Sequence, residues 1–171
     1  MPAARLITSA LAAITLLTGC AGYQVGPVNG QPAGARAVTI QIFRNDTFEP
    51  RLSEAVTFAL RRRLQQDGTY RLDTKNDGDI IVSGSIADFR RTPVSFDPAD
   101  IITPRDYELA IVANVTAQER VSGKMLLDQQ FFGRTTIRTT PNRDVAERQA
   151  HPIMAEDLAR NIASALTEGP W

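Results

Sequence analysis

Cys20 and His151 are the only cysteine and the only histidine in this 171-residue chain. A Cys/His zinc site needs several such ligands and an internal disulfide needs two cysteines, so the sequence predicts neither. His151 has no second histidine to pair with, and no nucleophile or orienting acid is apparent near it in the sequence. We therefore expect a surface or packing role for His151, and a protein that is not an enzyme and uses no metal or cofactor.

Asp73, Asp77 and Asp79, with Asn76 and Gly78 between them, faintly resemble a calcium-binding loop. An EF-hand loop also needs a bidentate glutamate at its twelfth position. A glycine or an aspartate stands there, whether the count begins at Asp73 or at Asp77. We therefore expect a solvated turn.

Cys20 ends a segment that reads as a secretion signal, MPAARLITSALAAITLLTGC. Arg5 forms a short basic region, and the largely apolar stretch after it is too short to span a bilayer of about 30 Å. The four residues that end at Cys20 match the bacterial lipobox pattern, which is apolar, small, small, Cys. We predict that residues 1–19 are cleaved and that Cys20 carries covalent acyl chains, which anchor stably when several are present. The alternative is an ordinary signal peptide with a chance cysteine.

The residue after the predicted attachment site is Ala21 rather than Asp, which by the usual sorting rule indicates the outer membrane of a diderm bacterium. Residues 20–36 are rich in Gly and Pro and are predicted to form a flexible lipidated tether. Loss of Arg5 leaves 18 basic and 19 acidic residues, a net charge of −1. That balance argues against a nucleic-acid partner.

Arginine supplies nearly all the positive charge, with 17 residues among the 19 basic ones. Arg134 and Arg138 lie two alternations apart on a predicted strand, so they share a face about 13 Å apart, with Thr136 between them. Arg90 and Arg91 form a second basic pair beside a proline-rich segment. Guanidinium groups with hydroxyls suit phosphate binding. An ordinary solvated face, and an arginine content set by genome base composition, are the alternative interpretations.

Hydrophobic periodicity predicts the elements that must position these residues. Strands are expected at 37–43, 79–88, 107–118 and 125–138, with a short extended segment at 69–74 and a hairpin turn at 119–124. Helices are expected at 51–66, capped by Thr47 or Glu49, and from Thr140 to about residue 166, with a kink or break at Pro152. Residues 90–104 contain three prolines and no clear period, so a loop is expected there.

The element order β-α-β-β-β-α predicts an α+β fold. We expect a two-layer sandwich in a single domain, residues 37–171. Two helices would pack on one face of a roughly four-stranded, mostly antiparallel sheet, leaving the other face partly polar.

Five segments together resemble one family: GCAGY, VTIQIFRNDTFEP, LSEAVTFALRRRLQQDGTYRL, DYELAIVANVTAQE and IMAEDLARNIASAL. They are similar to the LptE family of lipopolysaccharide-assembly lipoproteins. The resemblance implies two helices on a four-stranded sheet and a non-enzymatic plug inside the outer-membrane barrel LptD. It also implies a part in delivering lipopolysaccharide to the outer leaflet, with basic residues contacting the phosphorylated lipid. By face and charge, we assign that contact to Arg134, Arg138, Arg90 and Arg91.

A strand followed by F-x-N-x-T is loosely shared with other outer-membrane lipoproteins. A cell-wall synthase activator or a secretion-pore subunit is therefore an alternative function. A pore subunit should form a ring, whereas an LptE-like protein should be monomeric with one barrel. A periplasmic enzyme would need a catalytic constellation that the sequence does not contain.

Overall fold

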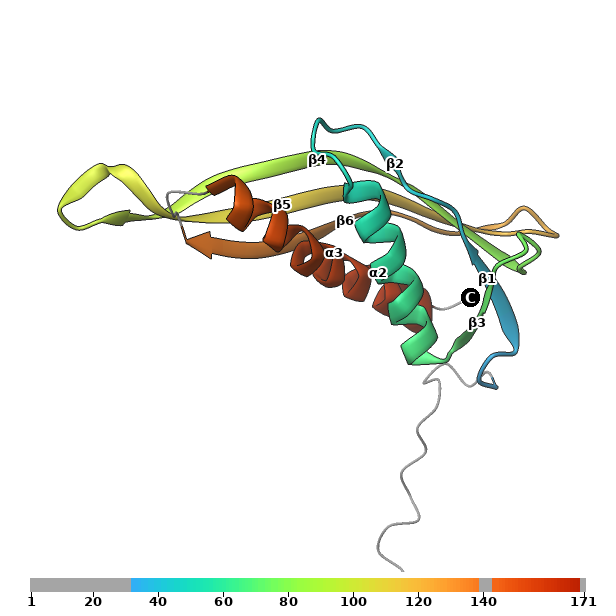
Figure 1. The fold of residues 1–171 in the computed structure, drawn as a ribbon. Coiled ribbons are helices and arrows are strands. Elements are labelled where there is room, and N and C mark those ends of the chain that lie inside the picture. Colours follow the sequence, from blue (N-terminus) through green and yellow to red (C-terminus); the bar gives the residue numbers. More distant parts are fainter. Residues whose placement is uncertain (1–31, 139–142, 170–171) are drawn as a thin grey trace, which may run out of the picture.

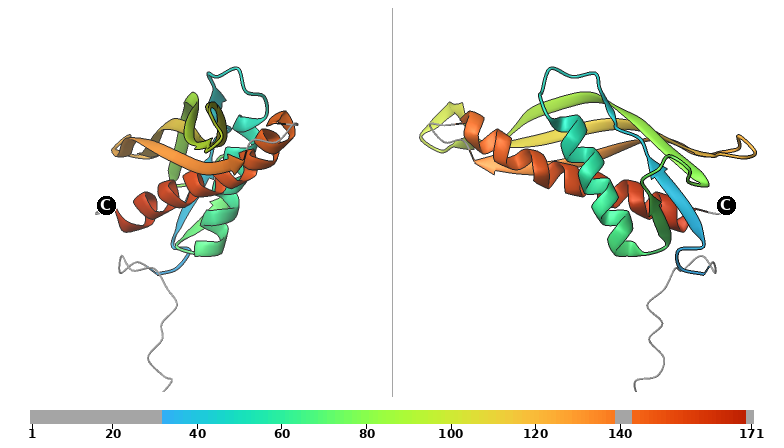
Figure 2. Two further views of the ribbon diagram at one scale, coloured as in Figure 1. Left: turned by 90° about the vertical axis from the view of Figure 1, so that its left-hand side faces the viewer. Right: turned by 45° about the vertical axis from the view of Figure 1, so that its right-hand side comes forward.

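The computed structural model describes residues 32–138 and 143–169. Two layers form the fold, with both helices on one face of a sheet (Figure 1, Figure 2). The strands are β1 (Arg36–Ile40), β2 (Arg44–Asn45), β3 (Tyr70–Asp73), β4 (Ile80–Asp97), β5 (Asp100–Glu119) and β6 (Met125–Arg138). The helices are α2 (Leu52–Asp67) and α3 (Arg143–Glu168). The predicted α+β class and the helices' common face are thus confirmed.

The sheet has six strands and mixed direction, so the expected four-stranded, mostly antiparallel sheet is wrong in detail. Its order is β3-β1-β4-β5-β6, with β2 beside β4. β1 is parallel to both β3 and β4, and β2 is parallel to β4, whereas β4, β5 and β6 are antiparallel. The parallel pairs arise because α2 crosses over the sheet between β1 and β3, which returns the chain in the same direction.

The predicted strand 37–43 is interrupted after Ile40, where the backbone turns toward α2. Three polar side chains on one face of α2 hold it there. Thr57 accepts a hydrogen bond from the Phe43 nitrogen at 3.1 Å, and Arg61 donates to the Ile40 carbonyl at 2.8 Å. Ser53 donates to the Phe43 carbonyl. This departure from the strand buries the Phe43 ring over Gly84. A Cβ at position 84 would lie 2.5 Å from the ring.

The loop predicted at 90–104 is instead a two-stranded ribbon. β4 continues to Asp97 and β5 begins at Asp100, and the two remain paired almost to the turn. Register shifts after Ile86, Pro93, Ser95 and Phe96 add residues that break the alternation. Because of those bulges, inward and outward residues do not alternate regularly, so the sequence pattern does not indicate strands here.

α2 begins at Leu52 without a side-chain cap, so the caps predicted at Thr47 and Glu49 are wrong. Thr47 instead bonds to Asn45 within a tight turn. At the other end Gly68 has φ 74° and its nitrogen bonds to the Leu64 carbonyl, as predicted for a glycine that ends a helix.

α3 runs without interruption through Pro152, so of the predicted kink or break the break is wrong, and a kink there stays a prediction. Pro152 cannot donate to the Arg148 carbonyl. Both residues are exposed, so water can reach that oxygen. The predicted helix start at Thr140 lies outside the described residues.

The core lies between the helices and the sheet, where α3 approaches closely at one strand glycine. A Cβ on Gly133 would collide with the Met154 carbonyl and lie 2.9 Å from the Leu158 nitrogen. Tyr70 donates a buried hydrogen bond to the Leu166 carbonyl at 2.7 Å, which ties β3 to the end of α3. Within the described ranges, neither helix is long and apolar enough to cross a bilayer.

Candidate functional site

The sheet face opposite the helices carries mostly polar side chains in rows that run across β4, β5 and β6. The Ser83 and Thr116 hydroxyls are 2.9 Å apart, and Gln130 donates to Asn114 at 3.0 Å in the next row. Exposed side chains from β6 continue these rows. The predicted partly polar second face is therefore present, and no helix covers it within the described residues (Figure 1, Figure 2).

Arg90 and Arg134 flank the small residue Ala110 in one cross-strand row of this open face. Strands are about 4.8 Å apart, so the two arginine Cα atoms lie about 10 Å apart. Arg134 stacks on the Phe132 ring at 5.6 Å and has no ion-pair partner among the described residues. The row thus presents two guanidinium groups on either side of the small Ala110 side chain.

Acidic neighbours hold two of the open-face arginines. Arg90 bonds to Asp88 at 2.6 Å, and this bond lowers the pKa of Asp88. Arg138 lies 3.4 Å from Asp106, whose pKa is lowered mainly by the Ser95 hydroxyl and further by Arg138. Arg134 is therefore the open-face arginine with the most available charge.

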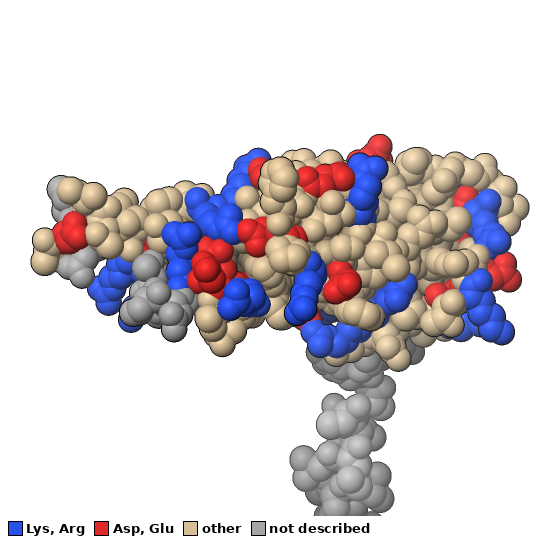
Figure 3. All heavy atoms as spheres, turned by 45° about the horizontal axis from the view of Figure 1, so that its top comes forward, with Lys and Arg blue, Asp and Glu red and all other residues tan. Residues whose placement is uncertain are grey.

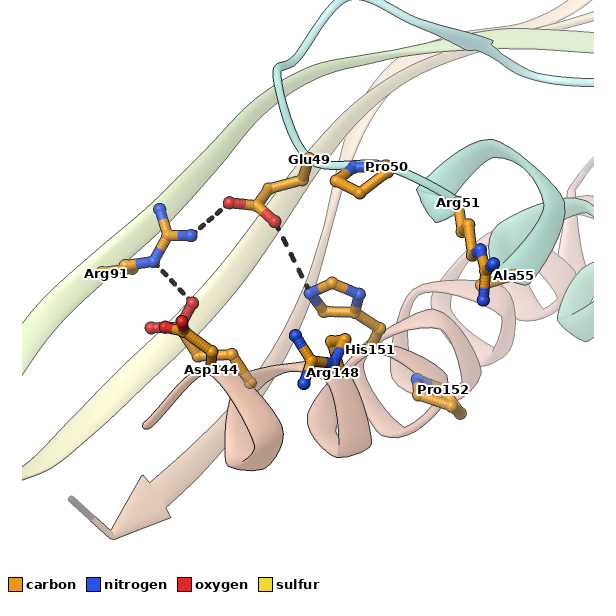
Figure 4. A pocket seen from close by; sticks show the side chains of 10 residues that line it. Glu49, Pro50, Arg51, Ala55, Arg91, Asp144, Arg148, His151 and Pro152 are labelled. Carbon is orange, nitrogen blue, oxygen red and sulfur yellow. Dashed lines mark hydrogen bonds and ion pairs between the residues drawn. The ribbon is translucent and has the colours of Figure 1, made fainter. Parts of the chain in front are cut away.

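Arg91 lies on the helix side of β4, apart from the other three arginines. Its Nε bonds to Glu147 of α3 at 3.0 Å, and its Nη2 bonds to Glu49 before α2 (Figure 4). Burial acts to lower the pKa of Arg91, but the two carboxylates outweigh it and raise the pKa. We call Arg91, Glu49 and Glu147 the clasp, because they join β4, α3 and the segment before α2.

His151 packs beside the clasp, as expected for a packing residue. Its ring meets Phe89 edge-on at 5.8 Å, and its Nε2 lies 4.0 Å from Glu49 with no hydrogen-bond partner within the described residues. Burial lowers the pKa of His151, although Glu49 acts to raise it. Burial therefore favours the neutral form of the His151 ring.

The clasp lines a half-open cavity of about 820 Å³ at the first turns of α2 and α3 (Figure 4). Its lining includes three arginines and three acidic residues. Because the charges balance and Arg91 is already paired, the cavity does not favour an anion. The open face is therefore the better candidate for binding phosphate.

The sequence indicated Glu49 only as a helix cap, and Glu147 was not singled out. They are separated from Arg91 by 42 and 56 residues, so their meeting depends on the tertiary fold. The β-strand alternation would have placed Arg90 and Arg91 on opposite faces, had their segment been recognised as a strand.

The carboxylates of the acidic turn accept hydrogen bonds from backbone nitrogens, one in the turn itself and one in the neighbouring strand β1. Asp73 accepts from the Asp77 nitrogen at 2.7 Å, which is the main cause of its lowered pKa, and Asp79 accepts from the Ala37 nitrogen at 2.7 Å. No group of three or more His, Cys, Asp or Glu in the described parts of the chain could hold a metal ion. Cys20 lies outside the described residues.

The family model for LptE, described as lipopolysaccharide-assembly, matches residues 35–166. A comparison with curated proteins gives no match.

Solved structures show similar folds at low identity. A hypothetical protein from Chlamydia trachomatis is 9% identical, with 81% of this chain and 98% of that chain covered and a TM-score of 0.59. Uncharacterized lipoprotein B from Nitrosomonas europaea is 14% identical, with coverage of 87% and 94% and a TM-score of 0.54. A minor lipoprotein from Acinetobacter baumannii is 13% identical, with coverage of 77% and 92% and a TM-score of 0.53. These likenesses concern the fold alone.

Proposed function

The chain belongs to the LptE family of lipopolysaccharide-assembly proteins, and from this premise we propose that it is a lipid-anchored plug of the outer-membrane barrel LptD. In this proposal, acyl chains on Cys20 hold it at the outer membrane. The domain lies in the barrel lumen, helps the barrel assemble and takes part in delivering lipopolysaccharide to the outer leaflet. It does so as a binding partner, without catalysis.

The observation that carries the proposal is the family match, and the polar open face supports it. The lumen of a large outer-membrane barrel is lined by polar groups and water. Hydroxyl, amide and charged side chains on β4, β5 and β6 suit such surroundings, because they keep hydrogen-bond partners there. An apolar face would instead require a dry partner.

The open edges of the two long strands β4 and β6 are protected against pairing with further strands, which suits a single plug. Asp157 of α3 accepts from the Arg134 nitrogen at 3.0 Å, and Asn161 donates to the Phe132 carbonyl at 2.8 Å. These bonds occupy part of the β6 edge. Beyond its pairing with β2, β4 has an open edge within the described residues. Pro93 interrupts that edge, because proline has no N–H to offer a partner strand.

We assign the phosphate contact to the open face, with Arg134 and Arg90 as its centre and Arg138 four residues, or two pleat repeats, further along β6. Arg91 is already bound by two carboxylates, so its share in that contact would require the clasp to open. In a direct contact, the guanidinium groups would form charge-assisted hydrogen bonds to phosphates of lipopolysaccharide, and some of these would be bidentate.

Co-purification tests the proposal. The acylated protein, tagged at its C-terminus and extracted from outer membranes in mild detergent, should bring down one large barrel protein that mass spectrometry identifies as LptD. Its depletion should reduce lipopolysaccharide at the cell surface. Recovery of a ring of this chain without a barrel, together with unchanged surface lipopolysaccharide, would instead favour a secretion-pore subunit.

A further inference from the structure

β4 and β5 form a two-stranded ribbon that extends beyond the other strands of the sheet. Within the described residues, β6 pairs with β5 only as far as Asp106 and Arg138, whereas β4 and β5 continue to the pair Asp97 and Asp100. Figures 1 and 2 show this end projecting beyond both helices. The ribbon end, residues 94–104, is therefore an isolated two-stranded segment that is open to contact by a partner.

The ribbon end exposes three large apolar side chains. Ile102 is 84% exposed, Val94 51% and Phe96 48%. Charged side chains of both signs gather where the ribbon joins the body, while the described atoms of the projecting end are mostly tan (Figure 3). A cluster of exposed apolar residues on a protruding element indicates an interaction site.

The backbone of the ribbon end is held in place before any partner arrives. The Asp100 carboxylate accepts from the Ile102 nitrogen at 3.0 Å and from the Thr103 nitrogen at 3.3 Å. Pro98 and Pro104 on either side have fixed φ angles. Because little further ordering is needed, docking of Ile102 would lose little conformational entropy.

Charge argues for a protein partner rather than a membrane surface. Residues 93–105 contain two aspartates and one arginine, and so lack the basic excess that attracts anionic headgroups. A polar lumen wall offers apolar side chains no dry contact. An apolar socket with a basic rim complements both the exposed side chains and the acidic balance.

The position of the ribbon end limits where that socket lies. Arg36, where the predicted tether enters the sheet, bonds to Glu119 at 2.6 Å. Glu119 ends the 20-residue strand β5, so the ribbon end lies about 60 Å away along the strand. That length exceeds the 40–45 Å of a whole bilayer, a rough figure that includes its headgroups. The ribbon end can therefore reach the side of the membrane opposite the anchor.

We propose that the ribbon end docks Phe96 and Ile102 into an apolar, basic-rimmed socket of the barrel partner, at the mouth remote from the lipid anchor. This inference rests on the proposed function, because the barrel is its partner. It adds the docking element and the chemistry of the surface that receives it.

Photo-crosslinking in the intact complex tests the docking. Ile102 is replaced by photoreactive benzoylphenylalanine in the full chain, which is co-expressed with the barrel LptD. Val121 is the matched control, because it is 94% exposed on the hairpin at the opposite end of β5. Position 102 should crosslink to a barrel peptide that contains apolar residues and Lys or Arg, and position 121 should not crosslink to that peptide. A crosslink from 102 to lipid, or to a purely polar lumen strand, would overturn the proposal.

A pair of variants measures the energetic contribution. Phe96→Ser combined with Ile102→Ser should weaken retention of the barrel about tenfold, the size of a typical interface anchor, whereas Val121→Ser should not. Thermal unfolding of each variant checks that the fold is retained. Equal retention by wild type and double variant would overturn the docking while leaving the plug function intact. Loss of the barrel from the wild-type preparation would instead contradict the proposed function itself.

Discussion

Arg90 and Arg91 are adjacent in the chain but lie on opposite faces of β4, and their surroundings give them different roles. Arg90 faces solvent with Arg134 across Ala110. Arg91 is held between Glu49 and Glu147. Charge available to an external phosphate therefore resides on the open face, and the paired charge of Arg91 joins elements of the fold.

Removing the open-face pair should weaken lipopolysaccharide binding. Charge-assisted hydrogen bonds contribute about 1.5–3 kcal/mol each, so Arg90→Ser with Arg134→Ser should lower affinity for purified lipopolysaccharide by about tenfold or more. The matched control is Arg63→Ser with Arg148→Ser, two exposed arginines on the helices and away from that face. Binding is measured by fluorescence titration at two salt concentrations. Equal losses from both double variants would show that net charge alone matters.

The single histidine gives the fold a defined pH dependence. Burial lowers the pKa of His151, so the folded state resists a proton that the unfolded chain accepts near its ordinary value of about 6.5. The free energy of unfolding should therefore be constant above that value and should fall as the pH drops from about 7 to 5. His151→Phe should remove this slope. A wild-type curve that is flat in this window would contradict the assignment.

Gly133 is needed because α3 lies directly over it. An alanine there would reduce the entropy of the unfolded chain, a gain of about 0.4–1 kcal/mol. Overpacking against the Met154 carbonyl and the Leu158 nitrogen should cost more, about 1–3 kcal/mol. Gly133→Ala should therefore lower the free energy of unfolding, measured in urea. An unchanged or higher value would mean that α3 sits further from β6 than described.

At the scale of elements, α3 contains a proline that its fold does not need. Pro152 costs a helix interior about 3 kcal/mol relative to alanine. Part of this is offset because proline restricts the unfolded chain. Since Pro152 is exposed and α3 is continuous, Pro152→Ala should raise the free energy of unfolding by about 1–2 kcal/mol. A destabilised variant would indicate that the helix requires a bend at this point.

Periodicity predicted the elements whose residues alternate regularly and missed those shaped by distant contacts. The hairpin turn at 119–124 and the predicted strands beside it match β6 and the second part of β5, because the alternation is regular there. The ribbon was missed because prolines and bulges disturb the strand period. The parallel placement of β1 between β3 and β4 follows from the α2 crossover, which local sequence does not encode.

The same distinction applies to the candidate site. Alternation alone placed Arg134 and Arg138 on one face, and the register of β6 agrees. The clasp joins residues from a loop, a strand and a helix, so single-sequence reasoning had no signal for it.

At the scale of the whole molecule, the two ends of β5 have different surroundings. One end lies beside Arg36, next to the predicted tether, and the other forms the projecting ribbon end (Figure 1). Between them lie the helical layer and the polar open face. The arrangement fits a plug anchored at one side of the membrane that extends through a barrel toward the other.

Native mass spectrometry of the detergent-extracted complex tests this account most directly. The account predicts one copy of this chain bound to one LptD barrel, with the chain beginning at Cys20 and carrying the added mass of its acyl chains. A mass corresponding to a ring of this chain without a barrel, or to an unacylated chain free of any barrel, would contradict it.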